Sequence, residues 1–190
     1  SAKGSLLISG DIGRPDDLMM RPPAPIEHAD VLVVESTYGD RLHGDEDSTE
    51  ALAGVIRRTA ARGGMVIVPA FAVGRAQSLL YQIWLLKKAG RVPDLPVFLD
   101  SPMAIDTTTI YQRHQGEHRL SAEDCRHMAH VARFCRTVEQ SRELNELNYP
   151  AIIISATIVA ASSSPVIRLA ARAVRGWWRA SAAYVSSVRT

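Results

Sequence analysis

The sequence predicts an α/β fold in which a mainly parallel sheet is flanked by helices. Apolar strand-like runs alternate with helical patterns between residues 48 and 155, an order that favours parallel strands joined by helical crossovers. The chain has 190 residues, of which 46% are hydrophobic and 22% charged. This composition is typical of globular proteins and excludes a disordered chain.

The predicted elements follow one another along the chain. Residues 5–9 and 30–35 are short apolar runs rich in β-branched residues and are predicted to be strands, with loop structure between them. Asp47 and Glu50 form a capping-box pattern ahead of a helix that ends at Gly63. The remaining elements are predicted as strands at 65–69, 96–100 and 151–155, and as helices at 74–90, at 106–114, after Ser121 and at 141–147.

Charge is unevenly distributed along the sequence. All 20 acidic residues and 17 of the 22 basic ones lie in residues 1–150, a net charge of −3. Residues 151–190 hold five arginines and no acidic residue. The formal charge of +2 therefore does not indicate a basic, nucleic-acid-binding domain, and any contact with an anion must be local.

Cysteine content and hydropathy indicate the compartment. Cys125 and Cys135 do not make a disulfide framework for a chain of this size, which favours a reduced, cytoplasmic protein. The longest uncharged run, residues 148–167, contains two prolines and three consecutive serines, so no membrane span is expected. The sequence shows no signal-peptide pattern.

The ends of the predicted parallel strands are the first candidates for a binding site. Ligands in open α/β sheets bind where the carboxyl ends of strands lead into helices. Three such ends are expected, in the segments PAFAVGRAQ, DSPMA and SAT. Gly74, Arg75 and Ser101 fall near helix N-termini, where backbone N–H groups favour phosphate.

Two acidic residues at the ends of the first two strands are candidates for catalysis. Asp11 follows a strand between glycines, which suits a metal ligand; the alternative is an aspartate that bonds its own turn. Glu35 ends four apolar residues and is expected to need a partner; the alternative is that it caps the next turn.

Four histidines in the second half of the chain raise the question of a zinc site. His114 and His118 straddle a glycine, and His127 and His130 are one helical turn apart without a third ligand nearby in sequence. We therefore expect these histidines to lie on an exposed helical face.

Five segments occur in a fixed order: ISGDIGRPDD, DVLVVESTYGDRLH, IVPAFAVGRAQSLLY, PVFLDSPMA and VEQSRELNELNYPAIIISA. Together they resemble the RNA-processing branch of the β-CASP metallo-β-lactamase family, which includes ribonucleases and mRNA 3′-end processing factors. The resemblance covers about residues 5–156. It implies a partial metallo-β-lactamase αββα domain in residues 1–38 and a β-CASP domain in residues 39–156.

The resemblance also implies a chemistry. Family members hydrolyse RNA phosphodiesters at a centre of two zinc ions. By matched position Asp11 resembles the aspartate that bridges the metals, and Glu35 resembles the acidic residue that helps to orient a histidine near them. Arg75 and Ser101 would lie on the β-CASP side of the RNA-binding cleft, and their contact with phosphate is our inference from strand-end geometry.

The sequence departs from this family in its metal ligands. The His-x-His-x-Asp-His motif expected upstream of Asp11 and the later ligand histidines are absent. A catalytic zinc has about three protein ligands, so we expect this chain to be a fragment that neither holds the zinc ions nor cleaves RNA by itself. The alternatives are a non-catalytic RNA-binding α/β module and a truncated product without stable function.

The C-terminal segment departs in composition. Residues 157–190 consist largely of Ala, Arg, Ser and Val where the family would continue with a glycine-rich loop. Such a composition is typical of an out-of-frame reading of a GC-rich gene. We hypothesise a frameshift near residues 156–158, the alternative being a genuine variant tail.

Overall fold

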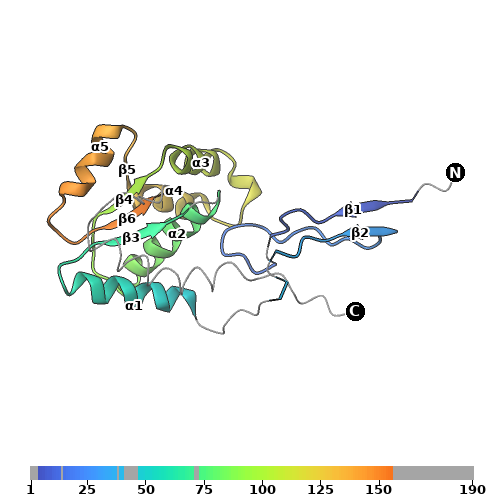
Figure 1. Cartoon of the computed structure of the whole chain (residues 1–190), viewed down its shortest axis with the longest axis horizontal. Coiled ribbons are helices and arrows are strands. Elements are labelled where there is room, and N and C mark those ends of the chain that lie inside the picture. The colour runs from blue at the N-terminus through green and yellow to red at the C-terminus, as the bar shows by residue number, and fades with distance from the viewer. Residues whose placement is uncertain (1–3, 14, 38, 41–46, 71–72, 156–190) are drawn as a thin grey trace.

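The computed structural model describes residues 4–13, 15–37, 39–40, 47–70 and 73–155. The described residues form a two-stranded ribbon near the N-terminus and an α/β unit over residues 48–155 (Figure 1). The frameshift hypothesis for residues 157–190 falls outside the described residues.

The sheet of the α/β unit is parallel throughout, as predicted. Its strand order is β3-β6-β4-β5, and every pair of neighbours is parallel. The apolar strand β6 is wholly buried because it lies between two neighbours and is covered on both faces. The strands are β3 (Val66–Pro69), β4 (Val97–Asp100), β5 (Arg133–Phe134) and β6 (Ile152–Ser155).

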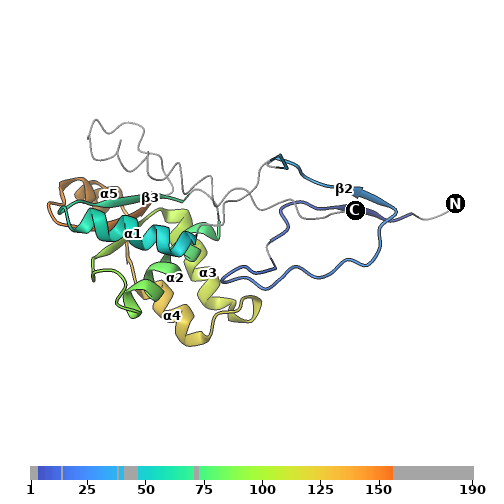
Figure 2. The same cartoon turned by 90° about the horizontal axis from the view of Figure 1, so that it is seen from below.

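Helices cover both faces of this sheet. One face packs against α1 (Ser48–Ala60), α2 (Arg75–Lys88), α3 (Pro102–Arg113) and α4 (Ala122–His130), which together enclose the main core. Figure 2 shows these four helices on one side of β3, with α4 farthest from it. The other face packs a smaller cluster around Phe98, Ile153 and Leu144, beside α5 (Val138–Glu143) and the 3-10 turn Leu144–Glu146.

The predicted helix N-termini are confirmed at α1 and α4. Asp47 Oδ1 accepts hydrogen bonds from the backbone N–H groups of Thr49 and Glu50, at 2.9 and 3.3 Å. Ser121 Oγ accepts one from Asp124 at 3.0 Å. The capping-box prediction at α1 was wrong in one respect. The Glu50 carboxylate does not return to the backbone N–H of Asp47 but binds Arg57 and Arg91.

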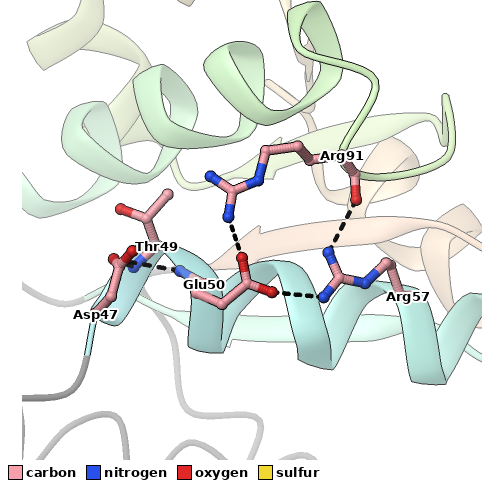
Figure 3. Close-up of polar contacts among 5 residues, drawn as sticks. All are labelled: Asp47, Thr49, Glu50, Arg57 and Arg91. Carbon is pink, nitrogen blue, oxygen red and sulfur yellow. Dashed lines mark hydrogen bonds and ion pairs between the residues drawn. The ribbon is translucent and has the colours of Figure 1, made fainter.

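Those arginines attach α1 to the end of α2. Glu50 Oε1 binds Arg57 at 2.6 Å and Oε2 binds Arg91. The Arg57 guanidinium also donates to the Arg91 carbonyl at 3.1 Å, which closes the network (Figure 3). The three side chains are roughly half exposed, so their contribution to stability is small.

The α/β unit differs from the prediction at one helix and one strand. The helix expected at 141–147 begins at Val138, because Thr137 and Gln140 form a reciprocal capping box that the prediction overlooked. Strand β5 was not predicted, since two residues carry no detectable periodicity.

The ribbon consists of β1 (Leu6–Ile8) and β2 (Val31–Val33), two parallel strands within the predicted segments. Ser5 donates to the Asp30 carboxylate through its backbone N–H at 2.6 Å and its hydroxyl at 2.8 Å, which aligns the two strand starts. These bonds hold the pKa of Asp30 below its ordinary value. Figure 1 shows the ribbon projecting away from the α/β unit.

The loop between β1 and β2 is attached to the α/β unit. The Met19 side chain is 1% exposed and belongs to the main core. Its carbonyl accepts a hydrogen bond of 2.7 Å from the backbone N–H of Arg119, and Met20 pairs with His118 in an antiparallel bridge. Arg119 also donates to the Pro15 carbonyl at 2.6 Å. The segment 15–20 therefore folds as part of the unit.

Among the described residues, no helix combines the length and the apolar character needed to cross a membrane.

Candidate functional site

The carboxyl ends of three strands lie level at one edge of the sheet. Pro69, Ser155 and Asp100 are register partners across β3, β6 and β4. The α2 and α3 helices both begin just beyond this row. The structure therefore brings Gly74, Arg75 and Ser101 to the same edge, as the parallel topology predicts. Residues 71–72 and those after 155 lie outside the described part of this edge.

Gly74 forms the entry to α2. Its φ of +85° lies in the left-handed region, which favours glycine. A Cβ at this position would also lie 3.3 Å from the Tyr111 hydroxyl. Arg75 is the first residue of the helix and is half-buried. The glycine thus allows the chain to turn sharply, so that the basic side chain follows directly at the helix N-terminus.

Ser101 is the N-cap of α3. Its buried hydroxyl accepts a hydrogen bond of 3.2 Å from the Ala104 N–H, and Pro102 occupies the first helical position. A hydroxyl that accepts in this way still carries one proton to donate. Ser101 therefore has a structural task, and any contact with phosphate would use its remaining O–H.

Gln77 joins the starts of the two helices, and the sequence reading missed it. Its side-chain oxygen accepts from the Gly74 N–H at 3.1 Å. Its amide donates to the Ala104 carbonyl and to Thr108 Oγ1, each at 2.9 Å. The side chain is fully buried. A glutamine three residues after an N-cap glycine is the sequence signal that would have indicated this role.

A negative charge lies at the same edge. Asp100 is half-buried, and its Oδ2 accepts a hydrogen bond of 3.0 Å from the Ser141 hydroxyl. Burial raises the pKa of the nearby Cys135 thiol, and the carboxylates of Asp100 and Glu143 raise it further. Cys135 is therefore a neutral thiol. An anion at this edge is favoured on the side of Arg75 and disfavoured beside Asp100.

Asp11 and Glu35 each follow the carboxyl end of one ribbon strand. Ser9 links their two strands, because its N–H donates to the Val33 carbonyl at 2.9 Å and its Oγ accepts from the Glu35 N–H at 3.1 Å. Asp11 is exposed and follows Gly10, which has a positive φ of 48°. Glu35 Oε2 accepts from the Thr37 N–H at 3.0 Å, so Glu35 caps the next turn, the alternative left open by the sequence.

The described residues do not by themselves fit a zinc centre. Within this part of the chain, no group of three or more His, Cys, Asp or Glu side chains gathers in a way that would hold a metal ion. Two carboxylates at the ribbon end fall short of the three or so ligands of a catalytic zinc.

The histidine prediction was correct at three positions and wrong at one. His114, His127 and His130 are exposed. His118 is buried, and its Nε2 lies 3.1 Å from the Tyr111 carbonyl. It lies beyond α3 in the segment that pairs with Met20, so docking of the N-terminal segment covers it.

Comparison with known proteins identifies the α/β unit. Residues 76–164 match the family described as the Beta-Casp domain. The chain is 36% identical over 110 residues to a ribonuclease of Thermus thermophilus. It is 37% identical over 117 residues to a cleavage and polyadenylation specificity factor subunit of Arabidopsis thaliana, and 30% identical over 164 residues to a transcription termination factor of Pyrococcus abyssi.

These matches cover unequal shares of the two chains. The first two cover 57% of this chain and the third covers 80%. They cover only 25%, 16% and 25% of the respective relatives. The chain therefore spans about a quarter or less of the length of the relatives it matches.

Proposed function

Because residues 76–164 are a β-CASP domain of the kind found in RNA-processing hydrolases, we propose that this chain supplies the RNA-holding surface of a zinc-dependent RNA hydrolase. The reaction would be cleavage of an RNA phosphodiester during RNA processing or decay. Two free, buried cysteines agree with a reduced compartment, and we place the protein in the cytoplasm.

The level row of strand ends is the observation that carries this proposal. Two helices begin at this edge, and their N-terminal N–H groups and positive dipole ends attract phosphate oxygens. Arg75 adds a guanidinium, which suits phosphate through its paired donors. Ser101 would donate its remaining hydrogen bond to the same backbone. Gln77 holds the two helix starts in a fixed relation, so the surface is formed before RNA binds.

We further propose that residues 1–38 belong to a metallo-β-lactamase domain and residues 39–156 to the β-CASP domain. Parallel strands are normally covered on both faces, yet six apolar residues in or next to the ribbon strands are 49–66% exposed (Leu6, Ile8, Val31, Leu32, Val33 and Val34). Such a ribbon is a stable element only within a larger sheet. Asp11 would then be one ligand of the zinc centre, and Glu35 would support it from the adjacent strand end.

RNA binding by the full 190-residue chain tests the central claim. We expect a single-stranded RNA to bind with an affinity that falls as salt is added, because phosphate contacts release counterions. The Arg75→Ala variant should bind several-fold more weakly, whereas Arg62→Ala, at an exposed position after α1, should bind as the wild type does. Equal binding by both variants, or no binding at all, would reject the proposal.

A second candidate is a non-catalytic RNA-binding module, favoured by the lack of a three-ligand cluster within the described residues. Zinc content and RNA cleavage by the purified chain test this candidate. Stoichiometric zinc with cleavage lost in Asp11→Ala would reject the module and overturn the expectation that this chain does not cleave RNA by itself. RNA binding without zinc or cleavage would support the module, and it is also the result expected of the isolated hydrolase fragment.

A further inference from the structure

Three aromatic rings form a continuous stack between α2 and α4, on the side of α2 away from the sheet. Trp84 stacks on Tyr81 with ring centroids 5.6 Å apart, and on His127 with centroids 5.3 Å apart and planes within 7°. Tyr81 and Trp84 are one turn apart on α2, and His127 comes from α4. Two helices therefore contribute to one set of nearly parallel rings.

The outer end of this stack is open to solvent and carries a cation. The His127 side chain is 50% exposed, and Trp84 is half-buried. The exposed Lys88 places its Nζ 4.7 Å from the centre of the Trp84 ring, within the range of a cation–π interaction. Neighbouring Lys87 binds Asp94 and the Leu95 carbonyl instead. Of these two lysines, Lys88 is therefore the one that contacts the Trp84 ring.

The charges facing the stack limit what it can bind. The Glu123 carboxylate oxygen Oε1 lies 3.6 Å from His127 Nε2. Burial raises the pKa of the Tyr81 hydroxyl and the Asp124 carboxylate raises it further, so this ring is neutral. Two carboxylates on α4 disfavour a phosphate directly over the rings. A flat, uncharged group fits the stack, with an attached negative charge directed toward Lys88.

A nucleobase with its phosphate has this combination of properties. Single-stranded nucleic acids bind to proteins chiefly by stacking bases on aromatic side chains while basic groups contact the backbone. We propose that Tyr81, Trp84, His127 and Lys88 form a second RNA-binding site, in which an unpaired base stacks on the ring series and Lys88 contacts the adjacent phosphate.

This inference rests on the proposed function, and α2 connects the two sites. The strand-edge site lies at the N-terminus of α2, whereas Lys88 is its last residue. Fourteen residues of helix span about 20 Å. A single-stranded RNA that extends from the strand-edge site along α2 would reach the aromatic stack after a few nucleotides. RNA longer than the edge site should therefore bind more tightly than a short oligomer.

Tryptophan fluorescence reports binding at the stack, because Trp84 is the middle ring of the series. The chain has three tryptophans, so the variant Trp177→Phe/Trp178→Phe leaves Trp84 as the only one. We expect an unstructured oligonucleotide of about 12 nucleotides to quench its fluorescence. Inorganic polyphosphate of equal charge should not, because it has phosphates but no bases. Quenching by both probes, or by neither, would overturn the inference.

Surface variants provide an independent measurement by fluorescence anisotropy with the same RNA. His127→Ala should weaken binding about fivefold or more, and Lys88→Ala should lower the slope of affinity against salt by about one unit. His114→Ala is the control for His127→Ala, and Arg113→Ala is the control for Lys88→Ala. Both residues lie at the end of α3, and neither change should alter RNA affinity or its salt dependence.

The outcomes separate the two proposals. If Arg75→Ala weakens RNA binding while His127→Ala and Lys88→Ala do not, the second site is rejected and the strand-edge site stands; the stack would then be a surface for protein contact. If only His127→Ala and Lys88→Ala weaken RNA binding, the stacking site is established and the strand-edge site is rejected. Failure of the wild type to bind RNA would overturn both.

Discussion

The buried side-chain amide of Gln77 donates a hydrogen bond of 2.9 Å to Thr108 Oγ1, and so joins the first turn of α2 to the middle of α3. The same glutamine binds the Gly74 N–H and the Ala104 carbonyl. Two helices that are separate in the chain are thereby held in register where both meet the carboxyl edge of the sheet. The geometry of the candidate site depends on one uncharged side chain.

We predict that Gln77→Leu lowers the free energy of unfolding by about 2 kcal/mol, because buried polar groups lose their partners. Urea unfolding measures the change. The matched control is Gln82→Leu on the same helix. Within the described residues Gln82 Oε1 is buried without a hydrogen-bond partner, so this change should be neutral or stabilising. Equal losses in the two variants would contradict the role assigned to Gln77.

Docking of the N-terminal loop gives a second prediction. Met19 is buried in the main core, so Met19→Ala should cost about 2–5 kcal/mol of unfolding free energy. It should also speed tryptic cleavage after Arg119, whose backbone N–H binds the Met19 carbonyl. Met103→Ala is the control, since Met103 is half exposed on α3 and its truncation should cost less than about 1 kcal/mol. If Met19→Ala behaves like this control, the loop is not part of the core.

The sequence predicted the α/β unit well because each element carried a local signal. Asp47 and Ser121 indicated helix starts, and the apolar run at 151–155 indicated the strand that the structure shows as β6. The bonds from Gln77 to α3 and from Arg119 to Met19 were not predicted, since in each the two partners are at least 27 positions apart. The site was predicted only in outline. Topology places Gly74, Arg75 and Ser101 at one edge, but the capping role of Ser101 and the adjacent Asp100 depend on packing.

The Glu50 network predicts a pH effect on stability. A hydrogen bond from Arg57, with further attraction from Arg91, holds the pKa of Glu50 below its ordinary value of 4.5. A carboxylate with a lowered pKa in the folded state stabilises the protein above its unfolded pKa, and this contribution is lost as pH falls through the folded pKa. Glu50→Gln should therefore destabilise the protein at pH 6. It should have no effect at a pH below the folded-state pKa of Glu50, where the wild-type carboxyl is protonated.

Urea unfolding of wild type and Glu50→Gln at a series of pH values from 6 downward measures this effect. We expect the two unfolding free energies to converge below about pH 4.5, the ordinary pKa of a glutamate. The difference at pH 6 should be small, because the pair is exposed. Glu117→Gln, at an exposed position in the 3-10 turn Gln115–Glu117, should leave the pH profile unchanged. A constant difference at every pH would contradict the ionic role of Glu50.

The ribbon predicts self-association of the purified chain. Leu6 and Ile8 are 63% and 66% exposed, and their register partners Val31 and Val33 are also exposed. Exposed apolar strands with unpaired edges promote edge-to-edge pairing. We expect the sedimentation coefficient of the wild type to rise with concentration. The variant Leu6→Lys/Ile8→Lys should remain monomeric, since charged side chains on an edge strand oppose pairing.

The control for this prediction is Ile110→Lys/Val138→Lys, which charges two equally exposed apolar residues on α3 and α5. It should associate as the wild type does, because isolated apolar residues on helices offer no free strand edge. If the control abolishes association as effectively as the ribbon variant, general surface charge is the cause. If the wild type is monomeric at every concentration, the ribbon does not promote association, and its exposed strands do not require burial within the metallo-β-lactamase domain to which we assign residues 1–38.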